Sequence, residues 1–201
     1  MSSKQKVAIV TGASQGIGAA LVKAFRERDY RVVATARSIK QGGDEDILAV
    51  RGDIGAPETA QRVVKEAVER FGRIDTLVNN AGIFIAKPFT EYTAKDFEAV
   101  LATNTAGFYH ITQAAVGEMV RQGSGHIVNI ASLAGLAGMA LGAPDATSKL
   151  GAVGLSPAVG AEGAGPGVKV TADCPAYIRP PIFDNGTYVR STKEGMLSLI
   201  P

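Results

Sequence analysis

A glycine-rich turn between a strand-like run and a helix-like run constrains this sequence more than any other feature. The stretch VAIVTGASQGIGAALVKAF places Gly12, Gly16 and Gly18 directly after an apolar run and at the beginning of an amphipathic segment. In such a unit the first glycine permits a tight turn, the second lets the backbone approach a pyrophosphate, and the third lets the helix pack closely on the sheet. The helix N-terminus favours an anion. The pattern predicts a dinucleotide site, against the alternative of a flexible turn without a ligand.

Short apolar runs alternate with helical segments along the rest of the chain. The runs KVAIV, RVVAT, ILAV, TLV, HIVNI and VKVTA are continuous and rich in β-branched residues, as expected of strands buried on both faces of a parallel sheet. The clearest helical segment covers residues 57–71, with Pro57 in its first turn and Gly72 at its C-cap. The alternation predicts an α/β fold: a doubly wound parallel sheet (Rossmann fold) in three α/β/α layers.

Two segments fit this pattern poorly. The crossover at residues 37–46 is close to the minimum of about 10–12 residues for a parallel connection, so any helix there should be short. Residues 145–163 should form a helix, yet they include Pro157, which costs about 3 kcal/mol inside a helix, and Gly160 and Gly163, which cost about 1 kcal/mol each. No linker or repeat divides the sequence, so we expect one dinucleotide-binding domain over residues 1–201.

Charge and cysteine content limit the partners and the cellular compartment that we expect for this protein. With 21 basic and 19 acidic residues, the net charge of +2 gives no reason to expect nucleic acid or a membrane as partner. The longest weakly polar run, residues 133–144, is too short and too glycine-rich to span a bilayer. The single cysteine, Cys174, excludes an internal disulfide, and His110 and His126 have no ligand partners nearby in sequence. We therefore expect a cytoplasmic protein without a metal site.

The end of the second strand-like run indicates which dinucleotide is bound. An acid about 20 residues after the glycine turn would bind the 2′-hydroxyl of NAD. Ala36 occupies that place, and Arg37 follows it. A guanidinium there suits a 2′-phosphate, so we expect NADP (NADPH) to be preferred and NAD to be possible. The alternative is a solvated loop arginine.

Further motifs, in order, resemble the short-chain dehydrogenase/reductase family. The TGxxxGxG spacing of residues 11–18 is followed by GDI at 52–54, NNAG at 79–82, NIAS ending at Ser132, and Lys149. The resemblance covers essentially the whole chain and implies hydride transfer between a nicotinamide cofactor and a carbonyl or alcohol. The contacts with the dinucleotide that it implies are Gly12, Ser14, Gln15, Gly16, Ile17, Gly18, Arg37, Asp53, Ile54, Asn80, Ala81, Gly82, Lys149 and Pro175.

The resemblance also implies a catalytic group. Ser132 would donate a hydrogen bond to the substrate oxygen as that oxygen gains negative charge. Asn104 would bind a water in a proton relay, and Lys149 would lower the pKa of a proton-donating phenol and hold the nicotinamide ribose. Taken singly, Ser132 could be a turn-former, and Asn104 could satisfy backbone groups inside a kinked helix.

The family's tyrosine, thirteen residues after the serine, is replaced here by Asp145. At four residues from Lys149, the simplest interpretation of Asp145 is a surface ion pair. An aspartate titrates near about 3.9 in model peptides, and Lys149 would favour its ionised form further. Asp145 would then carry no proton at neutral pH, and the protein would be nearly inactive in reduction. Two functions stay open: an NADP-preferring oxidoreductase, or a catalytically inactive dinucleotide-binding sensor or partner subunit.

The last part of the chain departs from the family pattern at further positions. Ala176 and Pro180 stand where the family has a glycine and a threonine that contacts the nicotinamide. The chain ends at Pro201 inside the substrate loop, so we expect the C-terminal strand of the sheet to be missing. The apolar loop 133–144 indicates an uncharged small-molecule carbonyl or alcohol as substrate. The resemblance implies a homodimer or homotetramer, with residues 95–122 and 145–163 at one interface.

Overall fold

A six-stranded parallel sheet forms the centre of the computed structural model, which describes residues 5–176 and 187–188. The strand order is β3-β2-β1-β4-β6-β7, and every pairing is parallel. The order reverses between β1 and β4, and such a switch point is where ligands bind beyond the carboxyl ends of the strands. The strands are β1 (Val7–Thr11), β2 (Arg31–Ala36), β3 (Ile47–Arg51), β4 (Thr76–Asn79), β6 (Gly125–Ile130) and β7 (Val168–Asp173).

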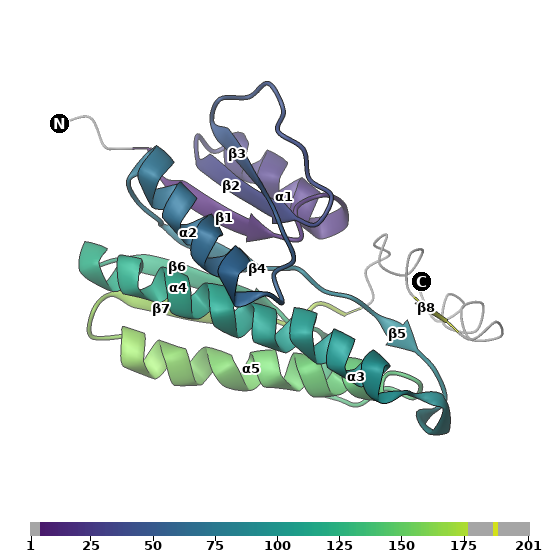
Figure 1. Cartoon of the computed structure of the whole chain (residues 1–201). Coiled ribbons are helices and arrows are strands. Elements are labelled where there is room, and N and C mark those ends of the chain that lie inside the picture. Colours follow the sequence, from purple (N-terminus) through teal and green to yellow (C-terminus); the bar gives the residue numbers. More distant parts are fainter. Residues whose placement is uncertain (1–4, 177–186, 189–201) are drawn as a thin grey trace.

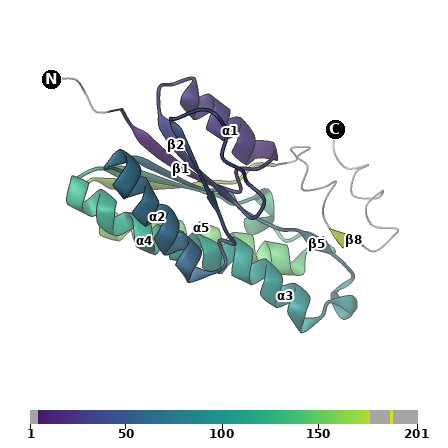
Figure 2. The same cartoon turned by 45° about the horizontal axis from the view of Figure 1, so that its top comes forward.

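Helices cover both faces of the sheet, which confirms the predicted doubly wound fold. One face carries α1 (Gly16–Arg26), and the other carries α2 (Pro57–Phe71), α4 (Gly107–Gln122) and α5 (Ala143–Gly163), as Figures 1 and 2 show. The core on the α2 side is the larger one and includes Ile9, Val63, Leu77 and Ile111. On the α1 side, Val10, Val32 and Val78 pack against Leu21 and Phe25. Residues 7–10 are fully buried because β1 lies in the middle of the sheet.

The crossover at residues 37–46 contains no helix. Turns and bends connect β2 to β3, and side chains hold them in place: Gln41 bonds to the backbone of Ile47 and Ala49, and Arg26 pairs with Asp44 at 3.0 Å and Asp46 at 2.8 Å. The connection is too short to carry a helix and still reach the neighbouring strand. The length of this connection limited any helix here to a short one, and the structure has none in this segment.

Helix α5 runs through all three of its helix-breaking residues. Pro157 is exposed, so its ring and missing N–H face solvent. Gly160 and Gly163 face β7, where an added Cβ would lie 3.6 Å from Val170 and 3.1 Å from Val168. The two glycines let the helix approach the sheet closely, and that packing offsets their low helix propensity.

A π-helical turn, Ala102–Ala106, joins α3 (Ala94–Leu101) to α4. Such a turn inserts one extra residue and changes the direction of the side chains that it carries. The short strand β5 (Ile85–Ala86) lies beyond the end of β4 and pairs with β8 (Thr187–Tyr188). None of the helices among the described residues is long and apolar enough to cross a membrane.

Candidate active site

The glycine turn after β1 packs directly against the turn after β4. Gly12 has a φ of 66°, and a Cβ placed there would lie 2.8 Å from the Cα of Ala81. A Cβ on Gly18 would overlap the carbonyl oxygen of Gly12 and lie 2.7 Å from Asn80 Nδ2. Gly18 is thus required by the contact between the two turns, rather than by the packing of α1 on the sheet that we expected. Both positions exclude any side chain.

The side chain of Thr11 joins these two turns by hydrogen bonds, a role that the sequence did not indicate. Its buried Oγ1 donates to the carbonyl of Val78 at 3.4 Å and accepts from the backbone N–H groups of Asn80 (2.9 Å) and Ala81 (3.0 Å). Asn80 Nδ2 in turn donates to the carbonyl of Thr11 at 2.9 Å. The sequence feature that could have indicated this role is the position of Thr11, at the end of a buried strand and directly before Gly12.

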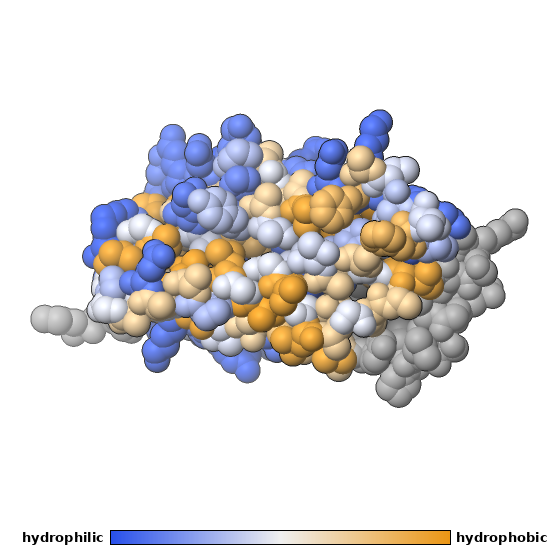
Figure 3. All heavy atoms as spheres, turned by 90° about the horizontal axis from the view of Figure 1, so that it is seen from below, coloured by the Kyte–Doolittle hydropathy of each residue, from blue (hydrophilic) through white to orange (hydrophobic). Residues whose placement is uncertain are grey.

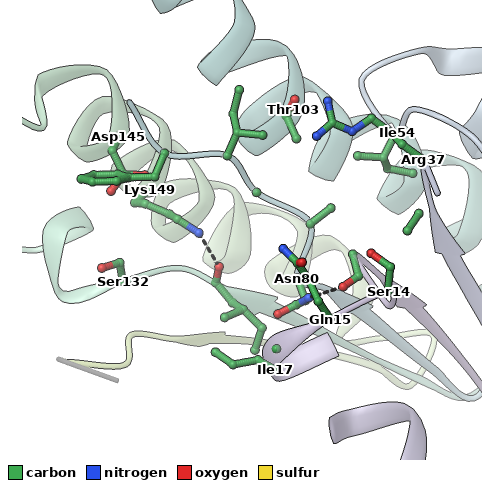
Figure 4. A pocket seen from close by; sticks show the side chains of 18 of the residues that line it. Ser14, Gln15, Ile17, Arg37, Ile54, Asn80, Thr103, Ser132, Asp145 and Lys149 are labelled. Atoms are coloured by element: carbon green, nitrogen blue, oxygen red, sulfur yellow. Dashed lines mark hydrogen bonds between the residues drawn. The ribbon is translucent and has the colours of Figure 1, made fainter. Parts of the chain in front are cut away.

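A cavity of about 400 Å³ lies at the carboxyl ends of the strands, across the switch point (Figure 4). Its size falls in the range of ligand pockets. Of the predicted dinucleotide contacts, all but Gly18 line it: Gly12, Ser14, Gln15, Gly16, Ile17, Arg37, Asp53, Ile54, Asn80, Ala81, Gly82, Lys149 and Pro175. Further lining residues were not predicted, among them Thr35, Ser38, Ile83, Phe84, Thr103, Ile130 and Met139.

One end of the cavity is open and carries a cation. Arg37 is exposed and lies near Ile54 at this end (Figure 4). The carbonyl of Arg37 accepts a hydrogen bond from Arg51 Nε at 2.8 Å. The side chain of Asp53 stabilises the turn that this residue begins, because its Oδ1 accepts a hydrogen bond from the N–H of Gly55 at 3.0 Å. This end therefore offers a guanidinium to an anionic group, next to a carboxylate held in a fixed turn.

Asp145 and Lys149 lie at the opposite end, and they do not form the expected surface pair. Asp145 is only 8% exposed, and Lys149 Nζ donates to the carbonyl of Ile130 at 2.9 Å. No ion pair joins Asp145 and Lys149 among the described residues. Figure 4 shows both side chains, together with Ser132, at the same end of the cavity.

Burial, rather than Lys149, controls the charge of Asp145. Loss of solvation raises the pKa of Asp145, and the opposing attraction of Lys149 is the smaller effect. Lys149 does favour the ionised form, as expected, but burial outweighs it, so the expectation of an Asp145 pKa below its ordinary value was wrong. Burial likewise lowers the pKa of Lys149, with Asp145 as the largest opposing influence. The two pKa values are displaced toward each other.

Asn104 lies at the centre of the π-helical turn. Its side chain connects Ile83, which lies between β4 and β5, with α5. Its Oδ1 accepts from the N–H of Ile83 at 2.9 Å, and its Nδ2 donates to the carbonyl of Ile83 at 3.1 Å. The same Nδ2 lies 3.1 Å from Ser148 Oγ and 3.5 Å from Asp145 Oδ1. Asn104 thus satisfies backbone groups, but those of Ile83 in the segment after β4 rather than those of its own kinked helix, and it also contacts the carboxyl group of Asp145.

Ser132 combines a turn-forming role with a place in the cavity wall. Its Oγ accepts from the N–H of Ala134 at 3.1 Å and caps a short 3₁₀ helix, Leu133–Gly135. Because this bond uses a lone pair, the hydroxyl proton can be donated into the cavity. Ala176 also lines the cavity, whereas Pro180 lies outside the described residues.

Tyr92 fixes the loop that closes this end of the cavity, a role that the sequence did not indicate. Its hydroxyl oxygen lies 2.7 Å from the carbonyl oxygen of Ile85 and 2.8 Å from that of Leu141, so its one proton is shared between these two acceptors. Leu141 has a φ of 64°, an unusual conformation for a residue with a branched side chain. The phenol thereby holds residues 139–142, and with them the cavity-lining Met139, against β5.

Comparisons with known proteins agree on one family. The profile of a family described as "short chain dehydrogenase" matches residues 6–187. Acetoacetyl-CoA reductase of Acinetobacter sp. (strain RA3849) is 34% identical over 191 residues, which covers 90% of this chain and 77% of that protein.

Two solved structures share the fold. A short-chain dehydrogenase/reductase from Burkholderia phymatum in complex with NAD has a TM-score of 0.89 at 24% identity, over 98% of this chain and 79% of that one. ElxO with NADP bound has a TM-score of 0.84 at 26% identity, over 98% of this chain and 92% of that one.

Proposed function

Since the chain belongs to the short-chain dehydrogenase/reductase family of oxidoreductases, we propose that it binds NADPH in preference to NADH and reduces a small carbonyl compound. The observation that carries this proposal is the arrangement of the cavity. Two turns without room for side chains lie along its wall, Arg37 stands at one end, and Ser132, Asp145 and Lys149 stand at the other. A single extended ligand can therefore contact Arg37 at one end of the cavity and the proton-transfer groups at the other.

The cavity wall fits a dinucleotide. Gly12 and Gly16 line the cavity without side chains, and the N-terminus of α1 would face an anion bound there. Arg37 would bind the 2′-phosphate, and the NADP bound to ElxO supports this choice, while the NAD in the Burkholderia structure keeps NAD possible. Lys149 would hold the nicotinamide ribose. When bound, the dinucleotide supplies the hydride.

The residues of this chain would supply the proton. Ser132 would donate its hydroxyl proton to the substrate oxygen, and Asp145 in its acid form would protonate that oxygen as charge develops. Because burial raises the pKa of Asp145, the side chain keeps its proton to a higher pH than an exposed aspartate does. Turnover would depend on that acid form and would decline as the pH rises through the pKa of Asp145.

The surroundings of Asp145 indicate the substrate class. Ile83, Phe84, Met139 and Ala176 give this end of the cavity an apolar wall. An uncharged ketone fits such a wall better than a charged one. The relative from Acinetobacter is a reductase of acetoacetyl-CoA, whose reacting 3-oxo group is an uncharged ketone even though its coenzyme A part is anionic, and a 3-oxoacyl thioester is therefore the first substrate to test.

A second candidate function is dinucleotide binding without turnover. Its support is the position of the carboxyl group of Asp145, which lies 3.5 Å from Asn104 Nδ2 and extends less far into the cavity than a phenol would. In this case the protein would act as a sensor or as a partner subunit. Both functions predict NADPH binding, and they differ in turnover alone.

The face formed by α3, α4 and α5 has features of a surface through which two copies of the chain could associate. Figure 3 shows hydrophobic side chains at the surface of the molecule seen from below. The large apolar side chains exposed on the helices of this face are Phe97 of α3, Tyr109 and Val120 of α4, and Leu150 of α5. We propose that this face forms the interface of a homodimer or homotetramer. Light scattering of the purified protein tests this proposal, and a monomer at all concentrations would contradict it.

The test of the function has two parts on one preparation. Titration with NADPH and NADH measures binding, and NADPH oxidation in the presence of acetoacetyl-CoA measures turnover across a pH series. Binding with turnover that declines as pH rises supports the reductase. Binding without turnover at any pH supports the second candidate, and failure to bind either dinucleotide contradicts both.

A further inference from the structure

We propose that Lys149 is also an amine nucleophile, which condenses with an aldehyde or ketone in the cavity when no dinucleotide is bound. Asp145 would carry the protons of this condensation. The inference rests on the proposed function only for its class of ligand, a small carbonyl compound. The product would be an imine between Nζ and the carbonyl carbon.

The position of Lys149 allows a carbonyl compound to reach it. Its side chain lines the cavity, and Nζ lies 3.9 Å from the place that a Cβ on Gly82 would occupy. Gly82 has no side chain to cover the amine from that direction. Nζ donates to the carbonyl of Ile130 and lies 5.8 Å from the centre of the Phe108 ring, so neither of these contacts is to a carboxylate.

Burial, which outweighs the attraction of the charged groups around it, shifts Lys149 toward a neutral amine. A lysine becomes nucleophilic when an apolar site removes its solvation and no strong ion pair restores its charge. Asp145 and Cys174 are the two titratable groups that face Lys149, and their attraction is smaller than the effect of burial, which lowers the pKa of Lys149. The same burial keeps Asp145 protonated to higher pH. Both pKa shifts displace the pair toward a neutral amine and a carboxylic acid, and condensation needs these two partners one helical turn apart.

The chemistry balances without an oxidant or reductant. The lone pair of Nζ forms a bond to the carbonyl carbon while the C–O π pair moves to oxygen and takes the proton of Asp145. The nitrogen then returns a proton to the carboxylate, which gives a neutral carbinolamine. Asp145 protonates the hydroxyl group, the C–O bond breaks, water leaves, and a protonated imine remains beside the carboxylate.

Reductive trapping of the native protein tests the proposal. The protein is incubated near neutral pH with acetone and cyanoborohydride, and peptide mapping by mass spectrometry follows the isopropyl group at each lysine. Lys169, which is exposed on β7, serves as the internal reference. We expect Lys149 to be labelled several-fold faster than Lys169 in the native protein and at a similar rate in the urea-denatured chain. Equal labelling of the two lysines in the native protein would overturn the proposal.

Two further arms assign the roles of Asp145 and of the cavity. An Asp145→Asn variant, which keeps the shape of the side chain, should lose most of the excess labelling at Lys149, and unchanged labelling would remove Asp145 from the reaction. Saturating NADPH should protect Lys149 and leave Lys169 unaffected. NADPH affinity of the same preparation is measured separately, so tight NADPH binding without labelling would reject this inference and leave the proposed function intact.

Discussion

Asn104 and Asp145 meet inside the protein, with Asn104 Nδ2 3.5 Å from Asp145 Oδ1, although they are 41 residues apart in the chain. The same amide is held by both backbone groups of Ile83, so its orientation is set by the segment after β4. The carboxyl group therefore belongs to a buried polar cluster with Asn104 and Ser148 and also lines the cavity. The protonation state of Asp145 therefore affects both the stability of the protein and the proton transfer that we propose for it.

The first prediction concerns Asp145→Asn and pH. Burial raises the folded-state pKa of Asp145 above its unfolded value of about 3.9, so the native state holds a proton that the unfolded chain releases. Wild-type stability should fall as the pH rises from about 4 through the raised pKa, and the variant should escape this loss. Urea denaturation across a pH series should show a variant that is more stable at neutral pH and equal to the wild type below about pH 4. A difference that persists unchanged at low pH would contradict this account.

The second prediction concerns the choice of dinucleotide. Hydrogen bonds to charged groups contribute about 1.5–3 kcal/mol, so Arg37→Ala should weaken NADPH binding by about 10–100-fold and change NADH binding little. Fluorescence titration measures both affinities. Arg28→Ala is the matched control, because Arg28 is exposed and donates to Ala24 within the end of α1, away from the cavity. An Arg37→Ala protein that binds NADPH as the wild type does would refute the role of Arg37.

The third prediction concerns the contact between the two turns. Gly18→Ala would force its Cβ against Gly12 and Asn80, so we expect a loss of about 1–3 kcal/mol in stability and of NADPH binding. Gly117→Ala in α4 is the control, since its Cβ would meet no atom within 4 Å and should add about 1 kcal/mol. Thermal unfolding and NADPH titration give both results. Retention of full binding by Gly18→Ala would mean that the turn is not the dinucleotide site.

The fourth prediction concerns Thr11. Thr11→Val keeps the shape of the side chain and leaves the N–H groups of Asn80 and Ala81 without their acceptor. A buried unsatisfied donor costs about 1–3 kcal/mol, so the variant should be destabilised by at least that amount. Thr11→Ser keeps the hydroxyl and should retain most of the stability. Chemical denaturation compares the three proteins, and equal losses in the two variants would show that the methyl group matters instead.

The fold could be predicted because its signals are local. Strands buried on both faces need continuous β-branched runs, and all six predicted runs became strands of the central sheet, with ends that shifted by no more than one residue. Helix α2 begins at Pro57 and ends before Gly72, as its capping residues predicted. The turn between residues 11 and 18 was equally local, because its glycines are adjacent to the strand and helix that define their roles.

The environment of Asp145 could not be predicted, because it depends on residues distant in sequence. The sequence shows Lys149 one helical turn away, which suggested an exposed and ionised pair. In the folded protein, Asn104, which is itself held by Ile83, contacts the carboxyl group, and Lys149 donates to the carbonyl of Ile130. The same holds for Tyr92, whose partners Ile85 and Leu141 come together only when the loop closes on β5.

The central claim, that Asp145 stands at the proton-donor position of a reductase, is tested most directly by Asp145→Tyr. The phenol would extend into the cavity beside Lys149, and a positioned acid contributes about 10²–10⁴-fold to rate. Asp145→Phe supplies the ring without the hydroxyl as the matched control. In assays of NADPH oxidation with acetoacetyl-CoA near neutral pH, we predict that Asp145→Tyr exceeds the wild type by up to that factor and that Asp145→Phe does not. Equal rates for the wild type and Asp145→Tyr, in proteins that bind NADPH equally well, would contradict the account.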